Sequence, residues 1–270
     1  ELIFERRNAN SNAFEISNYP ISIDRGAGNS SNGGTCPSQN LADEYEMTNG
    51  DKFDWNNPAH SSNPFANRDP RFKATFICNG DVFNGHKVET WDDGVDGKNV
   101  EKGTKTGYYL RKYVDPNLDL KEDKTSQHLW YLIRLADLKL MFAEAANMVV
   151  GPNTSLYGYK AIDQLNDVRD RVGMPRKSAG SSEEFTEILR HERRVELAFE
   201  DSRYWDVRRW NIGGDVFSRD LMGLEVIPQG DGFIYKPRLV EKRTYQKYMD
   251  LYPIPESEII ITGFKQNPGW

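Results

Sequence analysis

The chain has 270 residues, of which 37 % are hydrophobic, and it carries a formal net charge of −6. The excess of acidic residues argues against nucleic acid as a partner, and no apolar run approaches the roughly 20 residues of a membrane-spanning helix. The length allows one large domain or two small ones. Because the chain opens on "ELIFERR" without a methionine, we expect a fragment of a longer parent.

Residues 1–128 are rich in turn signals, with short strand candidates between them. The stretch "LIFER" near the start predicts one strand, and "YYLRKYV" predicts another. In "FKATFICNGDVFNG", the residues Phe72, Ala74, Phe76 and Cys78 alternate on one face, which predicts a hairpin with "NGD" as its turn. We expect these few strands to pack on the helical part of the chain.

Metal ligands do not gather anywhere in the sequence. The four histidines are scattered, and Cys36 and Cys78 have neither CxxC spacing nor a histidine neighbour, so no metal site or cofactor is expected. A disulfide between these cysteines and two free thiols both remain open. The segment "DDGVDGKN" places Asp92, Asp96 and Gly97 at calcium-loop positions, but a glycine stands where the bidentate glutamate is needed. This excludes an EF-hand and leaves an irregular calcium site open.

Aromatic residues in the turn-rich loops are candidates for ligand binding. Tyr19, Tyr45, Trp55 and Trp91 lie in segments rich in Asn, Asp and Gly, and an aromatic face flanked by polar side chains suits a sugar ring and its hydroxyls. The alternative is that the tryptophans only cover the edge of the core. With two residues added from the loop "DRGAGNSSNGG", the predicted glycan-binding residues are Tyr19, Arg25, Asn29, Trp55 and Trp91.

Residues 129–210 are predicted to be helical. The segment "LWYLIRLADLKLMFAEAANMVV" (129–150) is apolar apart from one polar stripe, which predicts a helix buried on several sides and ended by "GPN". The next segment, "YKAIDQLNDVRDRV", has a clean apolar stripe, so the pair forms a helical hairpin like one tetratricopeptide unit. A third helix starts at Ser181, where Glu184 completes a capping-box pattern. The polar stripe of the first helix consists of Arg134, Asp137, Glu144 and Asn147.

The third helix carries "ILRHERRVELAFEDSRYWDVRRW", in which Glu192, Glu196 and Glu200 are spaced by four and therefore share one face. Like charges at this spacing repel each other, so the face requires cations. One interpretation is a carboxylate pair for acid/base chemistry. Nearby arginines would lower the carboxylate pKa values, the wrong direction for a general acid, so we favour an Arg–Glu framework. The expected cations are Arg193, Arg194, Arg203, Arg208 and Arg209.

Seven blocks follow one another over nearly the whole chain: "PSQNLADEYEMTNG", "NRDPRF", "TGYYLRKY", "RLADLKLMFAEAAN", "LNDVRDRVGMP", "HERRVELAFEDSRYWDVRRW" and "LYPIPESEIIITGFKQNPGW". Together, in this order, they resemble the C-terminal half of SusD/RagB-family proteins, the glycan-binding surface lipoproteins of Bacteroidetes. The resemblance implies a mainly α fold, in which a tetratricopeptide-like helical scaffold carries long irregular loops and a few short β-strands. We expect one structural unit, with residues 1–128 as the loop-rich segment and 129–270 as the helical scaffold and extended C-terminal tail.

The resemblance also implies a function. Family members are not enzymes; they lie on the outer membrane and deliver oligosaccharides to a TonB-dependent transporter of the SusC type. The lipid anchor would belong to a part preceding Glu1. The alternatives are a protein-interaction scaffold that contacts the transporter without binding glycan, and a glycoside hydrolase. The resemblance assigns the charged block to the scaffold, whose signature residues are Arg134, Glu144, Glu192, Arg193, Arg194, Glu196, Arg203, Asp206, Arg208 and Trp210.

Overall fold

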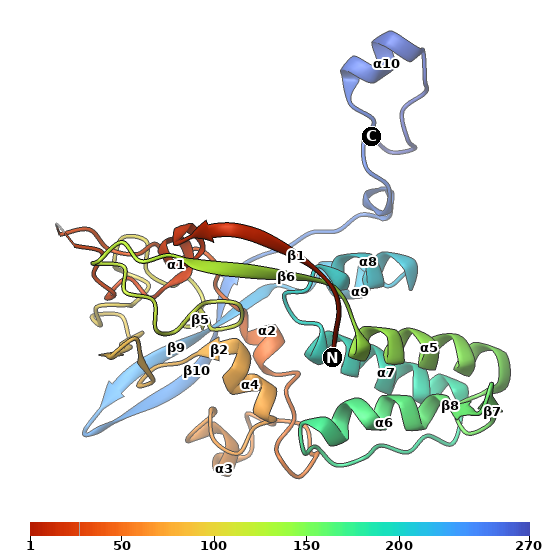
Figure 1. Cartoon of the computed structure of the whole chain (residues 1–270), viewed down its shortest axis with the longest axis horizontal. Coiled ribbons are helices and arrows are strands. Elements are labelled where there is room, and N and C mark those ends of the chain that lie inside the picture. Colours follow the sequence, from red (N-terminus) through yellow and green to blue (C-terminus); the bar gives the residue numbers. More distant parts are fainter. Residues whose placement is uncertain (27) are drawn as a thin grey trace.

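A computed structural model describes residues 1–26 and 28–270. Three helices, α5 (Leu135–Val150), α6 (Ala161–Arg171) and α7 (Ser182–Glu196), lie side by side (Figure 1). The apolar stripe predicted for α6 is confirmed, and alanines on α5 let the helices approach closely. The buried residues between these helices include Leu140, Ala143, Ala146, Leu165, Val168, Phe185 and Leu189.

The prediction that α5 is buried on several sides is wrong. Its outer face is apolar but open to solvent: Leu138 is 40 % exposed, Met141 42 % and Met148 81 %. Composition alone does not show which apolar residues of a helix find a neighbour. No helix among the described residues is both long and apolar enough to cross a bilayer.

Strand β6 (Ser126–Arg134) lies where the sequence predicted the first turns of α5. It pairs antiparallel with β1 (Leu2–Ser11), which confirms and extends the predicted N-terminal strand. The segment is rich in residues that favour strands, including Trp130, Tyr131 and Ile133. A continuous apolar run has no periodicity that separates helix from strand, and pairing with β1 decides the outcome.

The hairpin predicted around Phe72–Cys78 is wrong. Residues Pro70–Thr75 form helix α4, because Pro70 stands at its first position and the Asp69 carboxylate accepts the Arg71 amide at 2.9 Å. Strand β2 (Phe76–Ile77) pairs instead with β5 (Tyr109–Leu110). Of the strand predicted from "YYLRKYV", only these two residues of β5 are a strand. The tight hairpin joins β3 (Val82–Phe83) to β4 (His86–Lys87).

A second long ribbon, β9 (Leu221–Gln229) with β10 (Gly232–Glu241), was missed in a region predicted as scaffold and extended tail. Its turn is Gly230–Asp231, with Gly230 at φ 56°, a hairpin signal that the sequence does contain. Leu224 and Val226 from β9 pack in one cluster with Tyr45 and Phe72. The loop-rich segment and the rest of the chain therefore share this cluster.

The remaining elements are short, apart from α8. The remaining elements are α1 (Ala13–Asn18), α2 (Gln39–Ala42), α3 (Pro58–Ser61), β7 (Ser155–Leu156), β8 (Tyr159–Lys160), α8 (Ser202–Arg209), α9 (Gly213–Phe217), a 3-10 helix (Lys247–Asp250) and α10 (Glu256–Thr262). In Figure 1, α10 lies away from the rest of the chain, beyond an extended segment that follows β10.

Cys36 and Cys78 are both free thiols. The candidate calcium loop is held by internal contacts: Asp96 accepts the backbone amides of Ser22 at 2.9 Å and Glu89 at 3.0 Å, and Asp92 pairs with a lysine. Within the described ranges, no group of three or more His, Cys, Asp or Glu side chains is arranged to hold a metal ion. Asp92 and Asp96 therefore stabilise the loop through contacts within the chain.

Candidate functional site

The glutamates of α7 lie at the centre of a buried ion-pair network. Glu192 is fully buried and Glu196 is 4 % exposed. Arg71, from α4, contacts both: its Nη1 lies 2.6 Å from Glu192 Oε1 and 2.8 Å from Glu196 Oε2. Arg169, from α6, places Nη1 2.7 Å from the other oxygen of Glu192. The repulsion expected between neighbouring glutamates is thus relieved by arginines from two other helices.

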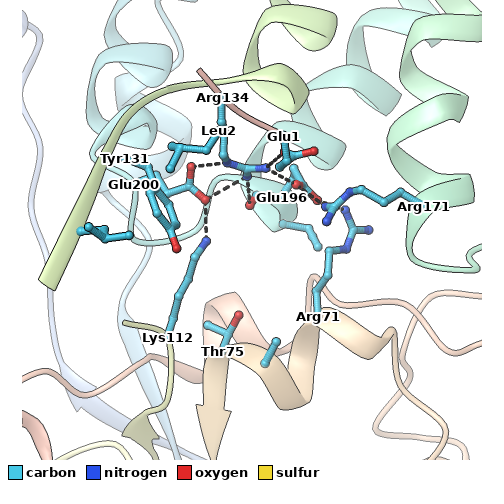
Figure 2. A pocket seen from close by; sticks show the side chains of 13 residues that line it. Glu1, Leu2, Arg71, Thr75, Lys112, Tyr131, Arg134, Arg171, Glu196 and Glu200 are labelled. Atoms are coloured by element: carbon cyan, nitrogen blue, oxygen red, sulfur yellow. Dashed lines mark hydrogen bonds and ion pairs between the residues drawn. The ribbon is translucent and has the colours of Figure 1, made fainter. Parts of the chain in front are cut away.

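Arg134, the last residue of β6, joins Glu196 to Glu200, which follows α7. Its Nη1 lies 2.6 Å from Glu196 Oε1 and its Nε 2.6 Å from Glu200 Oε2. Lys112 completes the arrangement, with Nζ 2.6 Å from Glu200 Oε1 and 2.7 Å from the Ala198 carbonyl. Figure 2 shows Arg134 between the two carboxylates, with Lys112 directed at Glu200.

The five cations expected to serve these glutamates lie elsewhere, so that expectation is wrong. Arg193 pairs with Asp206 at 2.8 Å and Asp137 at 3.0 Å. Arg194 pairs with Glu44, and Arg209 with Glu144. The guanidinium of Arg208 lies over Tyr204 and Tyr252, 4.4 and 4.9 Å from the ring centroids. Helical spacing on one element does not reveal which distant elements supply the charge.

A cavity of about 390 Å³ adjoins this network (Figure 2). Burial alone would raise the pKa of Glu196, but Arg134, Arg71 and Arg171 outweigh it, and the pKa lies below its ordinary value. A carboxyl group held ionised in this way is a poor proton donor. Each charged side chain that lines the cavity already has an oppositely charged partner within the chain. A ligand here would therefore have to displace internal ion pairs. The contacts support a framework role.

Tyr19, predicted to bind glycan, is 0 % exposed. Its ring packs edge-on against Phe83 with centroids 5.1 Å apart, and its hydroxyl donates to the Asp115 carbonyl. Tyr45 is also 0 % exposed and packs edge-on against Phe72 and Phe76. Neither ring presents a face to solvent, so neither can stack on a sugar.

The other predicted residues are accessible but dispersed. Trp55 is partly buried and donates its indole N–H to Asp43 Oδ1 at 3.0 Å. Trp91, also partly buried, packs against Phe233 of β10 with centroids 5.1 Å apart. Arg25 and Asn29 donate to carbonyls of their own loop, each at 3.3 Å. None of these residues lines the cavity of Figure 2, or a second, larger cavity between the 43–53 loop, α7 and the α8–α9 region.

The larger cavity, of about 900 Å³, lies between the 43–53 loop, α7, and the α8–α9 region. Its volume is within the range of small-molecule sites. No local pattern in the sequence predicts this cavity, because its walls come from segments more than a hundred residues apart. The charged and polar residues around it are Asp43, Glu44, Glu46, Lys52, Arg176, Lys177, Ser178, Glu184, Glu187, Arg190, His191, Arg194, Arg203, Asp215 and Arg219.

Most charges around this cavity are paired within the chain. Lys177 Nζ lies 2.7 Å from Glu46 Oε1, and Arg190 Nη1 lies 2.7 Å from Glu187 Oε1. Arg203 differs: the contacts of the described residues include no hydrogen bond or ion pair from its guanidinium. Burial, followed by the repulsion of Arg194, lowers the pKa of Arg203 to about 10. The positive charge of Arg203 therefore borders the cavity without a carboxylate partner among the described residues.

The model of the SusD family matches residues 1–270, the whole chain. The chain belongs to the SusD family. Among solved structures, a SusD-like protein from Bacteroides fragilis superposes with a TM-score of 0.83 at 28 % identity, covering 100 % of this chain and 54 % of that one. A SusD-like carbohydrate-binding protein from the same species has 30 % identity and a TM-score of 0.69, covering 83 % of this chain and 47 % of that one.

Curated relatives agree with this assignment. A SusD-like protein from Bacteroides ovatus is 32 % identical over 145 residues, which are 52 % of this chain and 24 % of that protein. SusD-like protein P2 from Formosa agariphila is 28 % identical over 151 residues, 51 % of this chain and 25 % of that protein. The chain spans about half the length of the solved structures above, and its matches cover about a quarter of these curated relatives.

Proposed function

We propose that this SusD-family chain binds an oligosaccharide without cleaving it, and that the sugar occupies the 900 Å³ cavity between the 43–53 loop, α7 and α8–α9. The observation that carries the proposal is the match to the SusD-like carbohydrate-binding protein of Bacteroides fragilis, at a TM-score of 0.69 over 83 % of this chain. The cavity supports it, since its size and mixed polar lining suit a ligand rich in hydroxyl groups.

Hydrogen bonding would dominate sugar recognition in this cavity. Phe53, the aromatic residue in its wall, has the Arg68 guanidinium 4.1 Å from its ring centroid and the His60 ring stacked 5.5 Å away. Guanidinium and ammonium groups donate to hydroxyl oxygens, and carboxylates accept from hydroxyl protons. Trp55 lies next to the cavity through its bond to Asp43, so it remains a candidate for the rim.

The non-catalytic part of the proposal rests on the state of the carboxylates. Glycoside hydrolysis requires one carboxylic acid that donates a proton and a second carboxylate beside it. The most conspicuous carboxylate group, Glu192 with Glu196, is instead held by arginines. We therefore expect incubation with oligosaccharides to release no new reducing ends.

At the level of the whole protein, we propose a surface lipoprotein of the outer membrane that passes glycan to a SusC-like TonB-dependent transporter. The lipid anchor would lie in a part preceding Glu1, and the fold would continue the tetratricopeptide-like scaffold begun by α5 and α6. The competing proposal is an interaction scaffold whose partner is the transporter alone.

The test is isothermal titration calorimetry of the chain, and of its full-length parent, with maltoheptaose, xylohexaose and trigalacturonate, followed by a reducing-end assay. Saturable binding without new reducing ends is the expected result. If the full-length parent binds none of these probes and gives no signal on a glycan array, yet co-purifies with a transporter, the scaffold alternative replaces glycan binding. New reducing ends would show an enzyme.

A further inference from the structure

Arg203 occupies an unusual position at the start of α8. The turn between α7 and α8 holds two non-glycine residues in the left-handed region, Phe199 at φ 62° and Asp201 at φ 59°. Such backbone conformations are uncommon and persist only where surrounding structure enforces them. The turn fixes the direction in which α8 begins, and so the placement of Arg203, its second residue.

Arg203 lines two neighbouring hollows. One is the 900 Å³ cavity, where Arg194 and Arg219 also form the wall. The other is a pocket of about 470 Å³, which Arg203 lines together with Asp201, Tyr204 and Trp205. Trp205 is 60 % exposed, an unusual state for so large an apolar side chain. A cation and an accessible aromatic side chain thus border one pocket.

Internal anions do not neutralise Arg203. The carboxylates that attract its charge most strongly are those of Glu44 and Asp206. Glu44 already pairs with Arg194, and Asp206 pairs with Arg193 and Arg209. Arg219, the third cation, is exposed and donates to the Asp215 carbonyl at 2.9 Å. Arg194 and Arg219 both act on Arg203 as like charges, and an anion bound beside them would relieve this repulsion.

We propose that Arg203, aided by Arg194 and Arg219, binds the anionic group of an acidic sugar, a carboxylate or a sulfate ester. The planar guanidinium fork matches the oxygens of either group through two parallel hydrogen bonds. The Trp205 side chain in the adjoining pocket offers apolar surface to the ring that bears the charge. This inference rests on the proposed glycan-binding function and narrows it to glycans that carry negative charge.

The experiment measures calorimetric affinities for two pairs of probes that differ only in charge. The first pair is trigalacturonate and its methyl ester, in which the carboxylates are masked. The second is a sulfated carrageenan oligosaccharide and the same oligosaccharide after desulfation. The proteins are the unmodified chain, Arg203→Gln, Arg203→Lys, and Arg243→Gln as a control whose side chain is 42 % exposed and lies outside both hollows.

We expect at least one charged probe to bind at least tenfold more tightly than its neutral counterpart. Arg203→Gln should remove most of that preference, Arg203→Lys should retain part of it, and Arg243→Gln should leave it unchanged. The pair that shows the preference identifies carboxylate or sulfate as the recognised group. Circular dichroism and thermal melting of each variant separate loss of binding from loss of fold.

Two results would overturn the inference, and they differ in their consequence. If neutral probes bind as tightly as charged ones and Arg203→Gln changes nothing, glycan binding stands but the acidic specificity fails. If no probe binds to either the chain or its full-length parent, the glycan-binding proposal fails with it.

Discussion

Two groups of arginines approach helix α7 from opposite sides, and they differ in what neutralises them. On one side, Arg71, Arg134 and Arg169 are nearly buried and each contacts at least two carboxylates. On the other, Arg203 and Arg219 border a 900 Å³ cavity and have no carboxylate partner among the described residues. Nothing in the sequence alone separates these two groups. The paired arginines support the framework role, and the unpaired arginines beside open space are the basis of the proposed anion site.

The largest expected effect comes from breaking the network at Glu196. Glu196→Ala removes the carboxylate shared by Arg71, Arg134 and Arg171. The buried Arg71 and Arg134 each lose one anionic partner, and breaking a buried ion pair costs about 3–5 kcal/mol of unfolding free energy. Urea unfolding followed by circular dichroism measures it. The matched control is Glu187→Ala on the same helix, whose side chain is 73 % exposed and whose loss should cost less than about 1 kcal/mol. Equal losses would contradict the framework role.

The pH dependence of stability separates the two regions further. The pKa of Glu196 is lowered by its arginines against the opposing effect of burial, and Lys177 and Arg169 likewise lower that of Glu46. Because the pKa of Glu196 is lower in the folded chain, the unfolded chain takes up a proton first as the pH falls. The contribution of Glu196 to the unfolding free energy is therefore complete above its ordinary pKa of 4.5 and is lost as the pH falls through its folded-state pKa. The unfolding free energy should decrease between pH 7 and pH 3. It should decrease less steeply in Glu196→Gln than in the unmodified chain. An identical slope in that variant would contradict the ion-pair assignment.

The tryptophan pair tests which region holds the glycan. Trp55 donates to Asp43, which lines the cavity, whereas Trp91 packs against Phe233 of β10. Trp55→Ala should weaken oligosaccharide binding about tenfold, or about 1.4 kcal/mol, and Trp91→Ala should leave it unchanged. Calorimetry with the best of the three probes decides. A loss confined to Trp91→Ala would move the site to the surface around Trp91 and β10.

The smallest effect concerns the cap of α7. The Ser181 side chain accepts the Glu184 amide at 3.2 Å, as the capping-box pattern predicted, but the Glu184 carboxylate accepts from Gly180 rather than Ser181. Ser181→Ala should therefore lower the unfolding free energy by about 1 kcal/mol. Thermal melting checks this, with Ser178→Ala as a nearby serine control that caps no helix. No change on Ser181→Ala would show that packing alone holds the start of α7.

Local patterns predicted the elements whose causes are local. The apolar stripe of α6 and the Ser181 cap of α7 depend on neighbours in sequence, and both are present. The helix expected at 129–134 is a strand because β1, more than a hundred residues away, pairs with it. Helix α4 was missed although Asp69 and Pro70 form a recognisable start signal, because the alternating residues around it were given more weight.

The candidate site was harder to predict than the fold. The framework interpretation of Glu192 and Glu196 came from charge balance, yet nothing in the sequence links them to Arg71, which lies 121 and 125 residues away. Arg203 was assigned to the same framework as one of the arginines near the glutamates in the sequence, and because the block that contains it resembles the family's scaffold. Only the folded chain shows that it borders open space, since that depends on the 43–53 loop and α9 meeting α7.

The most direct test of the contrast between the two arginine groups is hydrogen–deuterium exchange of the chain, with and without a saturating excess of whichever probe among maltoheptaose, xylohexaose and trigalacturonate binds best. Glycan binding in the 900 Å³ cavity predicts slower exchange in segments 43–53 and 203–219 and unchanged exchange in β6. Slower exchange confined to β6 and the segment around Lys112 would place the ligand in the Arg–Glu network and contradict the account.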